Sequence, residues 1–480
     1  MTARRPRLFR ALAGATFLAL FQLCFAPQAL AISEDDAFFL LMRTGFHPTQ
    51  ARVKALAASP SRAAAISVLV NGVTPALAVA PPAWTSQPIT PPPPYCGKLT
   101  DPAAIAACVA ADSAYWSLIS NQKGDLRAWY VAQMMASPSP LTERLTLFWH
   151  NHFTTQLSKS GEQPWLVFNQ HRIIRRNAAG SFSTMLAQIM TDPAMLIFLD
   201  QQLSTAKAPT ANFARELMEL FTLGQSNAQG VPNYTETTVT EVARALTGLN
   251  VDSATGLFLY KAADHDTGVK TILGQTGNFD YTDVARILLA NPNCPILIVS
   301  ELWKEFVSPT PDMAQVATIA SSFGANYQIA PVLTALFNSD AFWSPANRGT
   351  LVKSPAEFIV GAARALSLPN SEASGLASMI SYAGTPLFDP PNVRGFLTGV
   401  DSMSTYTLAA RQLNGSHLAN LWVTEVLPAG DDKANISPSE FAAIAAPNLL
   451  APAMLLQPTA NITPRTAAAR VLADPAYSLK

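Results

Sequence analysis

The sequence has little charge and, after its N-terminal segment, no long apolar run. Only 13% of residues are charged, and 32 Lys and Arg balance 32 Asp and Glu. Because a nucleic-acid-binding surface needs clustered Lys and Arg, this balance argues against that class of partner. Beyond the first 31 residues no stretch reaches 18 uninterrupted apolar residues. We therefore expect no stable membrane span in the remainder of the chain.

The N-terminal segment has the organisation of a secretory signal peptide. Four arginines without an acid precede an apolar run over residues 11–25, and Ala29-Leu30-Ala31 supplies small residues for cleavage. The alternative is an uncleaved anchor, but this run is shorter than the roughly 20 residues of a membrane span, and Pro27 interrupts it. We predict a signal peptide at residues 1–31 and a periplasmic or secreted protein. Because all 32 Asp and Glu follow this segment, cleavage leaves a net charge of about −4.

Cysteine is also scarce, with four residues in 480, and Cys24 lies in the predicted signal peptide. Cys96 and Cys108 are close in sequence and follow a proline-rich stretch. An oxidising compartment makes a disulfide between them reasonable. Cys294 remains, and we interpret it as a buried, inert thiol because no motif surrounds it.

Alternating strand patterns are hard to find, whereas helix signals are frequent. Ser354-Pro355-Ala356-Glu357 is a capping box with proline at the first helical position. Val239, Val242, Ala243 and Leu246 form one apolar stripe that ends before Gly248. These patterns predict a mainly α protein, a multi-helix array with few or no short strands.

Few breaks divide the chain. Residues 80–95 contain seven prolines, which preclude helix and favour an extended surface segment. We predict a single helical domain over residues 32–425, with a Pro-rich insertion at about 80–110. A C-terminal helical extension follows over 426–480, where Ser437-Pro438-Ser439-Glu440 repeats the capping pattern.

Histidine is rare as well, with six residues, and two of them stand close together in Trp149-His150-Asn151-His152-Phe153. If the preceding helix continues, His150 and His152 point about 200° apart, because successive residues rotate by about 100°. If the helix ends near Trp149, alternate residues share a side and the pair could hold one metal ion. Local geometry therefore decides between the two possibilities.

Two further segments combine unusual polar residues. In residues 212–224, Glu216 and Glu219 lie on one side of a predicted helix, where two carboxylates could bind a cation or divide acid and base work. In residues 265–274, a loop presents His265, Asp266 and Lys270 together. Each group has a structural alternative, as a satisfied core histidine or a solvated, salt-bridged helix face. Their clustering nevertheless favours a shared polar site.

The same segments resemble a known family. The resemblance rests on matches that run in order from Arg43 to Gly395: Arg43-Thr44-Gly45-Phe46, Trp149-His150-Asn151-His152-Phe153, Asp192-Pro193-Ala194-Met195-Leu196, residues 214–224, Tyr234-Thr235-Glu236, residues 243–248, residues 265–274, Lys353-Ser354-Pro355 and residues 386–395. They strongly resemble the bacterial exported family catalogued as "domain of unknown function 1800".

This resemblance implies an exported, mostly helical protein of unsettled activity, often encoded beside another exported family that looks sulfatase-like or phosphatase-like. The chain departs from the family at Phe396, where Trp is usual, and at Pro209-Thr210-Ala211, where an acidic, Asn-rich turn is usual. The second departure lies just before Glu216 and weakens the transfer of a site to that residue. The family supplies no established catalytic residues.

Three functional hypotheses follow. The leading one is a metal-assisted hydrolase or polymer-modifying enzyme with one zinc-like divalent ion, acting on a carbohydrate-like substrate. In it His150, His152, His265 and Glu216 bind the metal, and Glu219, Asp266 and Lys270 are the catalytic candidates. The second is a non-catalytic helical scaffold that binds a sulfatase-like exported partner. The third is a metal-independent enzyme that uses Glu216 and Glu219 for acid and base catalysis.

Overall fold

The computed structural model describes residues 31–427, 435, 437 and 462–480. The predicted signal peptide, except for Ala31, lies outside these residues, and so does most of the predicted helix start at Ser437-Pro438-Ser439-Glu440.

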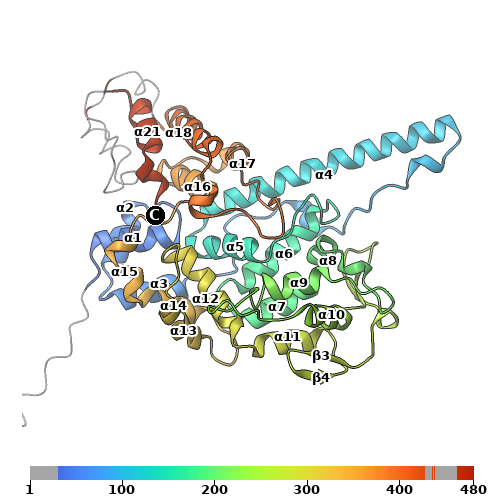
Figure 1. Ribbon diagram of the computed structural model, residues 1–480. Helices are drawn as coiled ribbons and strands as arrows, with labels where there is room; N and C mark the ends of the chain where they lie inside the picture. Colours follow the sequence, from blue (N-terminus) through green and yellow to red (C-terminus); the bar gives the residue numbers. More distant parts are fainter. Residues whose placement is uncertain (1–30, 428–434, 436, 438–461) are drawn as a thin grey trace, which may run out of the picture.

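The described part of the chain is mainly α-helical, which confirms the predicted fold class (Figure 1). The helices up to residue 245 are α1 (Glu34–Thr44), α2 (Gln50–Ala57), α3 (Arg62–Asn71), α4 (Pro102–Ala136), α5 (Pro140–His152), α6 (Pro164–Asn177), α7 (Phe182–Met190), α8 (Pro193–Phe198), α9 (Asn212–Glu219) and α10 (Glu236–Ala245). Those that follow are α11 (Tyr281–Ala290), α12 (Asn293–Phe306), α13 (Met313–Ala320), α14 (Ile329–Asn338), α15 (Asp340–Trp343), α16 (Pro355–Ala365), α17 (Ala373–Tyr382), α18 (Thr405–Glu425) and α21 (Pro464–Ala473).

The strands of the described residues form two small antiparallel hairpins between α10 and α11. They are β1 (Leu249–Val251) with β2 (Phe258–Tyr260), and β3 (Lys270–Ile272) with β4 (Gln275–Gly277). The β3–β4 turn places Leu273 and Gly274 at φ 48° and 80°. Two successive left-handed residues match the twist of a tight hairpin, and the glycine adopts this conformation without steric cost.

The predicted helix starts are confirmed where the structure describes them. Ser354 accepts a hydrogen bond from the Glu357 N–H, and the Glu357 carboxylate accepts one from the Ser354 N–H at 2.8 Å. Both orphan donors at the start of α16 are thereby satisfied. The Val239–Leu246 stripe likewise forms α10, whose buried face includes Val239, Val242 and Ala243.

Two hydrophobic cores share α5 as a partition. The first core contains side chains of α1–α3 and of α7–α15, and the second contains side chains of α4, α16–α18 and α21. Leu141, Leu145 and Trp149 of α5 belong to the first core, while Leu147 packs against the second. Phe148 packs against the first core, and both Leu147 and Phe148 also line the cavity described below.

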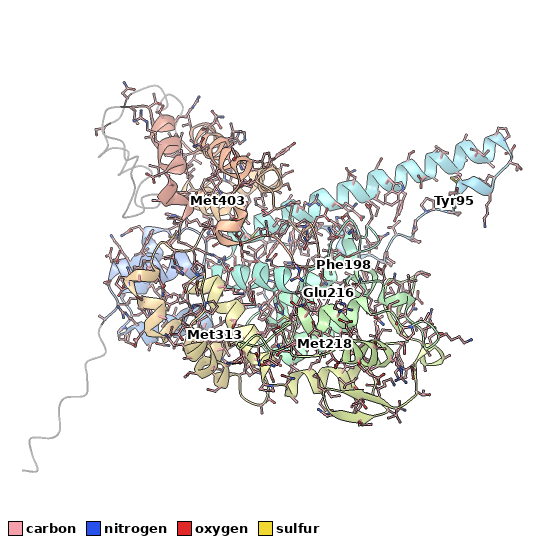
Figure 2. All side chains as sticks on the ribbon, viewed as in Figure 1. Tyr95, Phe198, Glu216, Met218, Met313 and Met403 are labelled. Atoms are coloured by element: carbon pink, nitrogen blue, oxygen red, sulfur yellow. A yellow bond between two sulfur atoms is a disulfide. The ribbon has the colours of Figure 1, made fainter. Side chains whose placement is uncertain are left out.

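The Pro-rich insertion and the first half of α4 form an arm that projects from the body (Figures 1 and 2, with Tyr95 near the tip). The predicted disulfide between Cys96 and Cys108 is present, with Cα atoms 5.8 Å apart. Apolar side chains on the arm face solvent, among them Tyr95, Val109 and Trp116. Of the helices that the structure describes, α4 alone has the length and composition to cross a membrane, although Asp112 interrupts its apolar run.

We expect loss of this disulfide to loosen the arm without unfolding the body. Closing a loop of this size contributes roughly 3 kcal/mol in the chain-entropy description. In a Cys96→Ser, Cys108→Ser variant, limited proteolysis should therefore cut residues 80–101 much faster than in the wild type. The melting temperature of the body should stay nearly constant, because both cores lie outside the arm. Equal cleavage rates for the two proteins would contradict this expectation.

Candidate functional site

A cavity of about 700 Å³ lies along helix α5. Side chains of α5, α9, α12 and α16 and of the loop over residues 385–402 line it. Cavities that bind small molecules typically enclose about 300–1,000 Å³. We refer to this space as the α5 cavity.

The floor of the α5 cavity is one helical face. Arg144, Leu147, Phe148 and Asn151 recur at the i, i+3, i+4, i+7 spacing of an α-helix, and all of them line the cavity. The histidines on either side of Asn151 are each rotated by about 100° from it. Since α5 continues to His152, the helical alternative of the sequence analysis is correct, and His150 and His152 point apart. Both still line the cavity, from opposite sides of Asn151.

His152 is held as a neutral imidazole. Its Nε2 lies 3.2 Å from the carbonyl oxygen of Phe221, which can only accept, so Nε2 carries the proton. Burial lowers the pKa of His152 to about 4, with smaller opposing effects of Glu301 and of the Phe221 carbonyl. Nδ1 has no protein partner among the described residues and is not fully buried. It is therefore available as an acceptor towards the cavity.

His150 contacts a histidine that sequence reasoning missed. Its Nε2 lies 3.0 Å from Nδ1 of His171 on α6, and the two rings are stacked. Burial lowers the pKa of His150 to about 3 and that of His171 well below its usual range. Since His171 follows His150 by 21 positions on another helix, only the packing of α5 on α6 brings them together.

Glu219 presents a carboxylate to the α5 cavity from α9. Arg394 Nη2 donates to its Oε1 at 2.6 Å, and the Tyr234 hydroxyl donates to its Oε2 at 3.4 Å. Glu216 lies one turn earlier on α9, in the middle of the body (Figure 2), and does not line the cavity. Burial, and next the charge of Glu219, raise the pKa of Glu216.

The loop over residues 386–398 is fixed to the end of α5 by Asn151. The Asn151 side-chain oxygen accepts a hydrogen bond from the Phe396 N–H at 2.7 Å. Gly395 has φ 83°, and a Cβ there would approach that same oxygen to 2.4 Å, so glycine is required. Phe396, where the family usually has Trp, lines the cavity beside this contact.

A buried ion-pair network forms one wall of the cavity. Arg144 pairs with Glu305 and Glu357, and Lys480 Nζ lies 2.6 Å from Glu357. Burial alone would raise the pKa of Glu357, but Arg144 and Lys480 overcome this effect and lower it to about 2. Glu357 also closes the capping box of α16, so we assign this network a structural role.

The other predicted site residues form a separate cluster. Arg244 binds the Asp266 carboxylate through Nε at 2.7 Å and also pairs with Glu241. Lys270 donates to the backbone oxygens of Asp266 and Gly268. Arg244 lowers the pKa of Asp266 to about 2. These contacts tie the loop before β3 to α10, and Asp266 and Lys270 do not line the α5 cavity.

The structure does not bring the predicted metal ligands together. His265 Nδ1 lies 3.0 Å from the Thr247 carbonyl oxygen, in the separate cluster, while His150 and His152 have the partners given above. Within the described ranges, no group of three or more His, Cys, Asp or Glu side chains has the spacing of a metal site. Of the four predicted ligands, His150 and His152 line the α5 cavity and Glu216 and His265 do not, so one ion shared by all four stays a prediction.

The fold and the cavity define a mainly α-helical protein with two cores and a cleft along α5 that polar and apolar side chains line. Residues 39–478 match the family model described as "Protein of unknown function (DUF1800)". The chain belongs to this family, as its sequence motifs indicated, and the match includes most of residues 426–480. No curated protein and no solved structure gives a significant match.

Proposed function

We propose that the protein is a hydrolytic enzyme that works by acid and base catalysis without a metal, in the α5 cavity. This proposal rests on one observation, that segments far apart in the sequence meet around one cavity. Residues from four separated family segments line one cavity: His150, Asn151 and His152; Glu219 and Leu220; Ser354; and Leu387, Phe388, Pro390, Val393 and Arg394. A packing role alone gives no reason for these segments to meet around open space.

Glu219 is the general base of this proposal. Arg394 and Tyr234 orient its carboxylate at the cavity wall. The carboxylate takes a proton from a water molecule as the water oxygen attacks the substrate, and it returns that proton to the leaving group when the scissile bond breaks. The free Nδ1 of His152 accepts a hydrogen bond from the substrate or from the water. The metal-dependent variant fits less well, because two of its predicted ligands, Glu216 and His265, do not line the cavity.

The lining of the cavity favours an uncharged substrate with polar and apolar parts. The lining includes Lys304 and Arg394 as well as Glu301 and Asp401, so neither sign of charge dominates. Phe148, Phe388 and Phe396 add apolar surface beside these polar groups. A neutral carbohydrate-like polymer has this combination. We place the reaction in the periplasm or outside the cell, supported by the signal-peptide pattern and by the Cys96–Cys108 disulfide.

The test is a hydrolysis screen of the purified protein with neutral glycosides, esters and amides, each with and without a chelator. We expect turnover of at least one class, an unchanged rate after chelation, and a rate at least about 10²-fold lower in a Glu219→Gln control. Loss of activity on chelation that zinc restores would contradict the metal-free mechanism and favour the metal-assisted one. Failure to turn over any class would contradict the enzymatic proposal.

The exposed arm favours a second function, that of a scaffold for a sulfatase-like exported partner. Val109 and Trp116 on α4 are 52% and 42% exposed, so these apolar side chains are not buried in either core of the body. Co-purification of such a partner, and its loss in a Val109→Asp, Trp116→Asp variant, would support this function. Because the arm and the α5 cavity are different surfaces, hydrolysis should persist in that variant.

A further inference from the structure

A second cavity, of about 150 Å³, lies beside the motif Arg43-Thr44-Gly45-Phe46, from which Thr44, Gly45 and Phe46 line it. The loop over residues 45–48, the end of α3, residues 138–141 and two arginines line it. We refer to it as the arginine pocket. It contains none of the groups assigned to catalysis above, so an inference drawn from it is independent of the hydrolytic proposal.

The two arginines of the pocket are Arg52 on α2 and Arg364 on α16. Arg52 Nη1 donates to the Pro138 carbonyl at 3.0 Å. Arg364 Nη1 donates to the carbonyls of Met134, Met135 and Ser137, at the end of α4. In the part of the chain that the structure describes, neither guanidinium forms an ion pair with a carboxylate.

Each guanidinium keeps unused donors. Nε and Nη2 of Arg52 and of Arg364 have no protein acceptor among the described residues, and none of these atoms is fully buried. Burial, and next the charge of Arg52, lower the pKa of Arg364 to about 10, with a smaller opposing effect of Glu143. Burial also lowers the pKa of Arg52. The pocket therefore holds two partly desolvated positive charges, neither of which has a carboxylate within ion-pair distance among the described residues.

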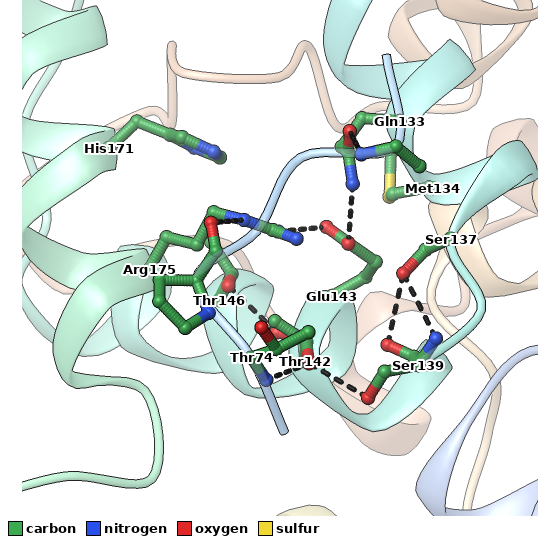
Figure 3. A network of polar contacts seen from close by, with 12 residues as sticks. Thr74, Gln133, Met134, Ser137, Ser139, Thr142, Glu143, Thr146, His171 and Arg175 are labelled. Carbon is green, nitrogen blue, oxygen red and sulfur yellow. Dashed lines mark hydrogen bonds and ion pairs between the residues drawn. The ribbon is translucent and has the colours of Figure 1, made fainter. Parts of the chain in front are cut away.

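Neutral donors complete the lining. Ser139 Oγ accepts a hydrogen bond from the Thr142 hydroxyl at 2.8 Å, which leaves the Ser139 hydroxyl proton free to donate (Figure 3). Phe46 and His47 also line the pocket. Guanidinium groups with unused donors beside a hydroxyl suit a negatively charged, oxygen-rich ligand.

Gly45 explains why the loop can approach so closely. A Cβ at this position would lie 2.9 Å from the Pro140 side chain and 3.0 Å from the Leu41 carbonyl oxygen. Glycine thus lets the loop close onto the start of α5 and form one wall of the pocket. The Gly45 carbonyl in turn accepts a hydrogen bond from Arg144 Nη1 at 2.8 Å, which fixes the loop against the buried ion-pair network.

We propose that the arginine pocket binds a tetrahedral oxyanion group, a phosphate or a sulfate, between Arg52 and Arg364. Its volume of about 150 Å³ is enough for several water molecules at about 30 Å³ each, so a compact tetrahedral oxyanion has room. Val68, which is 61% exposed, stands at the edge of the pocket, so the group can be a free ion or the end of a larger molecule.

The experiment is a calorimetric titration of the full chain with sodium phosphate and sodium sulfate, against sodium chloride at equal ionic strength. The wild type should bind phosphate or sulfate saturably with one site. An Arg52→Gln variant should raise Kd at least about tenfold, because it removes charge-assisted hydrogen bonds. The matched control is Arg172→Gln, since Arg172 is also a helical arginine but is exposed and lies outside the pocket.

Arg364 caps the end of α4, so Arg364→Gln could fail to fold, and Arg364→Lys is used instead. It keeps the charge but loses the planar donor fork, and it should raise Kd by less than Arg52→Gln does. Glycerol phosphate distinguishes the two sources of the group. Tighter binding than inorganic phosphate indicates a group on a larger molecule, and weaker binding indicates a free ion. Absence of saturable binding, or an equal Kd for wild type and Arg52→Gln, would overturn the proposal.

Discussion

Glu219→Gln is expected to lower the hydrolytic rate constant by about 10²–10⁴-fold, the usual contribution of general base catalysis. The amide keeps the size of the side chain but accepts no proton at neutral pH. Arg394 loses its ion pair at 2.6 Å, yet it is 68% exposed, so the loss should hardly affect stability. The measurement is the turnover rate on the substrate class found in the screen, together with the melting temperature of each protein.

Glu301→Gln provides the matched control. Glu301 also lines the α5 cavity, and its carboxylate pairs with Lys304 at 2.9 Å on the surface of α12. It has no contact with the groups that orient Glu219. Turnover by the Glu301→Gln variant should therefore stay within a few-fold of the wild-type rate. Equal losses in the Glu219 and Glu301 variants would show that the cavity needs negative charge in general, and Glu219 would not be the base.

The elements that could be predicted from the sequence are those set by local rules. The capping box at Ser354 and the stripe from Val239 to Leu246 each involve residues within two helical turns, so their physics is contained in a short segment. The disulfide between Cys96 and Cys108 is local in the same sense. The division into two cores is not local, because it depends on which helices pack against opposite sides of α5.

In the candidate site, too, local features could be predicted from the sequence and long-range contacts could not. The angle between His150 and His152 follows from helix geometry and was predictable, but their partners were not. His171 comes from α6 and Arg394 from a loop 175 residues beyond Glu219. Clustering along the sequence could not show that Asp266 and Lys270 lie away from the α5 cavity, where the Arg244–Asp266 pair ties their loop to α10.

Arg175→Met is expected to lower the free energy of unfolding by about 3–5 kcal/mol, the usual cost of removing one partner of a buried ion pair. Arg175 Nη1 lies 2.7 Å from Oε2 of Glu143, and the two side chains are 3% and 0% exposed (Figure 3). Gln133 donates to the other carboxylate oxygen at 3.0 Å. Without the guanidinium, Glu143 stays buried with one amide donor and without its ion-pair partner. Denaturant unfolding, followed by circular dichroism, measures the loss.

Arg172→Met is the control for lost helix surface, because Arg172 lies one turn earlier on α6 and is exposed. It should change stability by less than about 0.5 kcal/mol. Adding Glu143→Leu to Arg175→Met should recover much of the loss, since the double variant buries no unpaired charge. If the double variant is no more stable than Arg175→Met, the loss comes instead from the hydrogen bonds that Arg175 donates to the Pro75 and Ala76 carbonyls. The guanidinium would then act mainly as an anchor for the chain leading into the arm, and the pairing with Glu143 would be secondary.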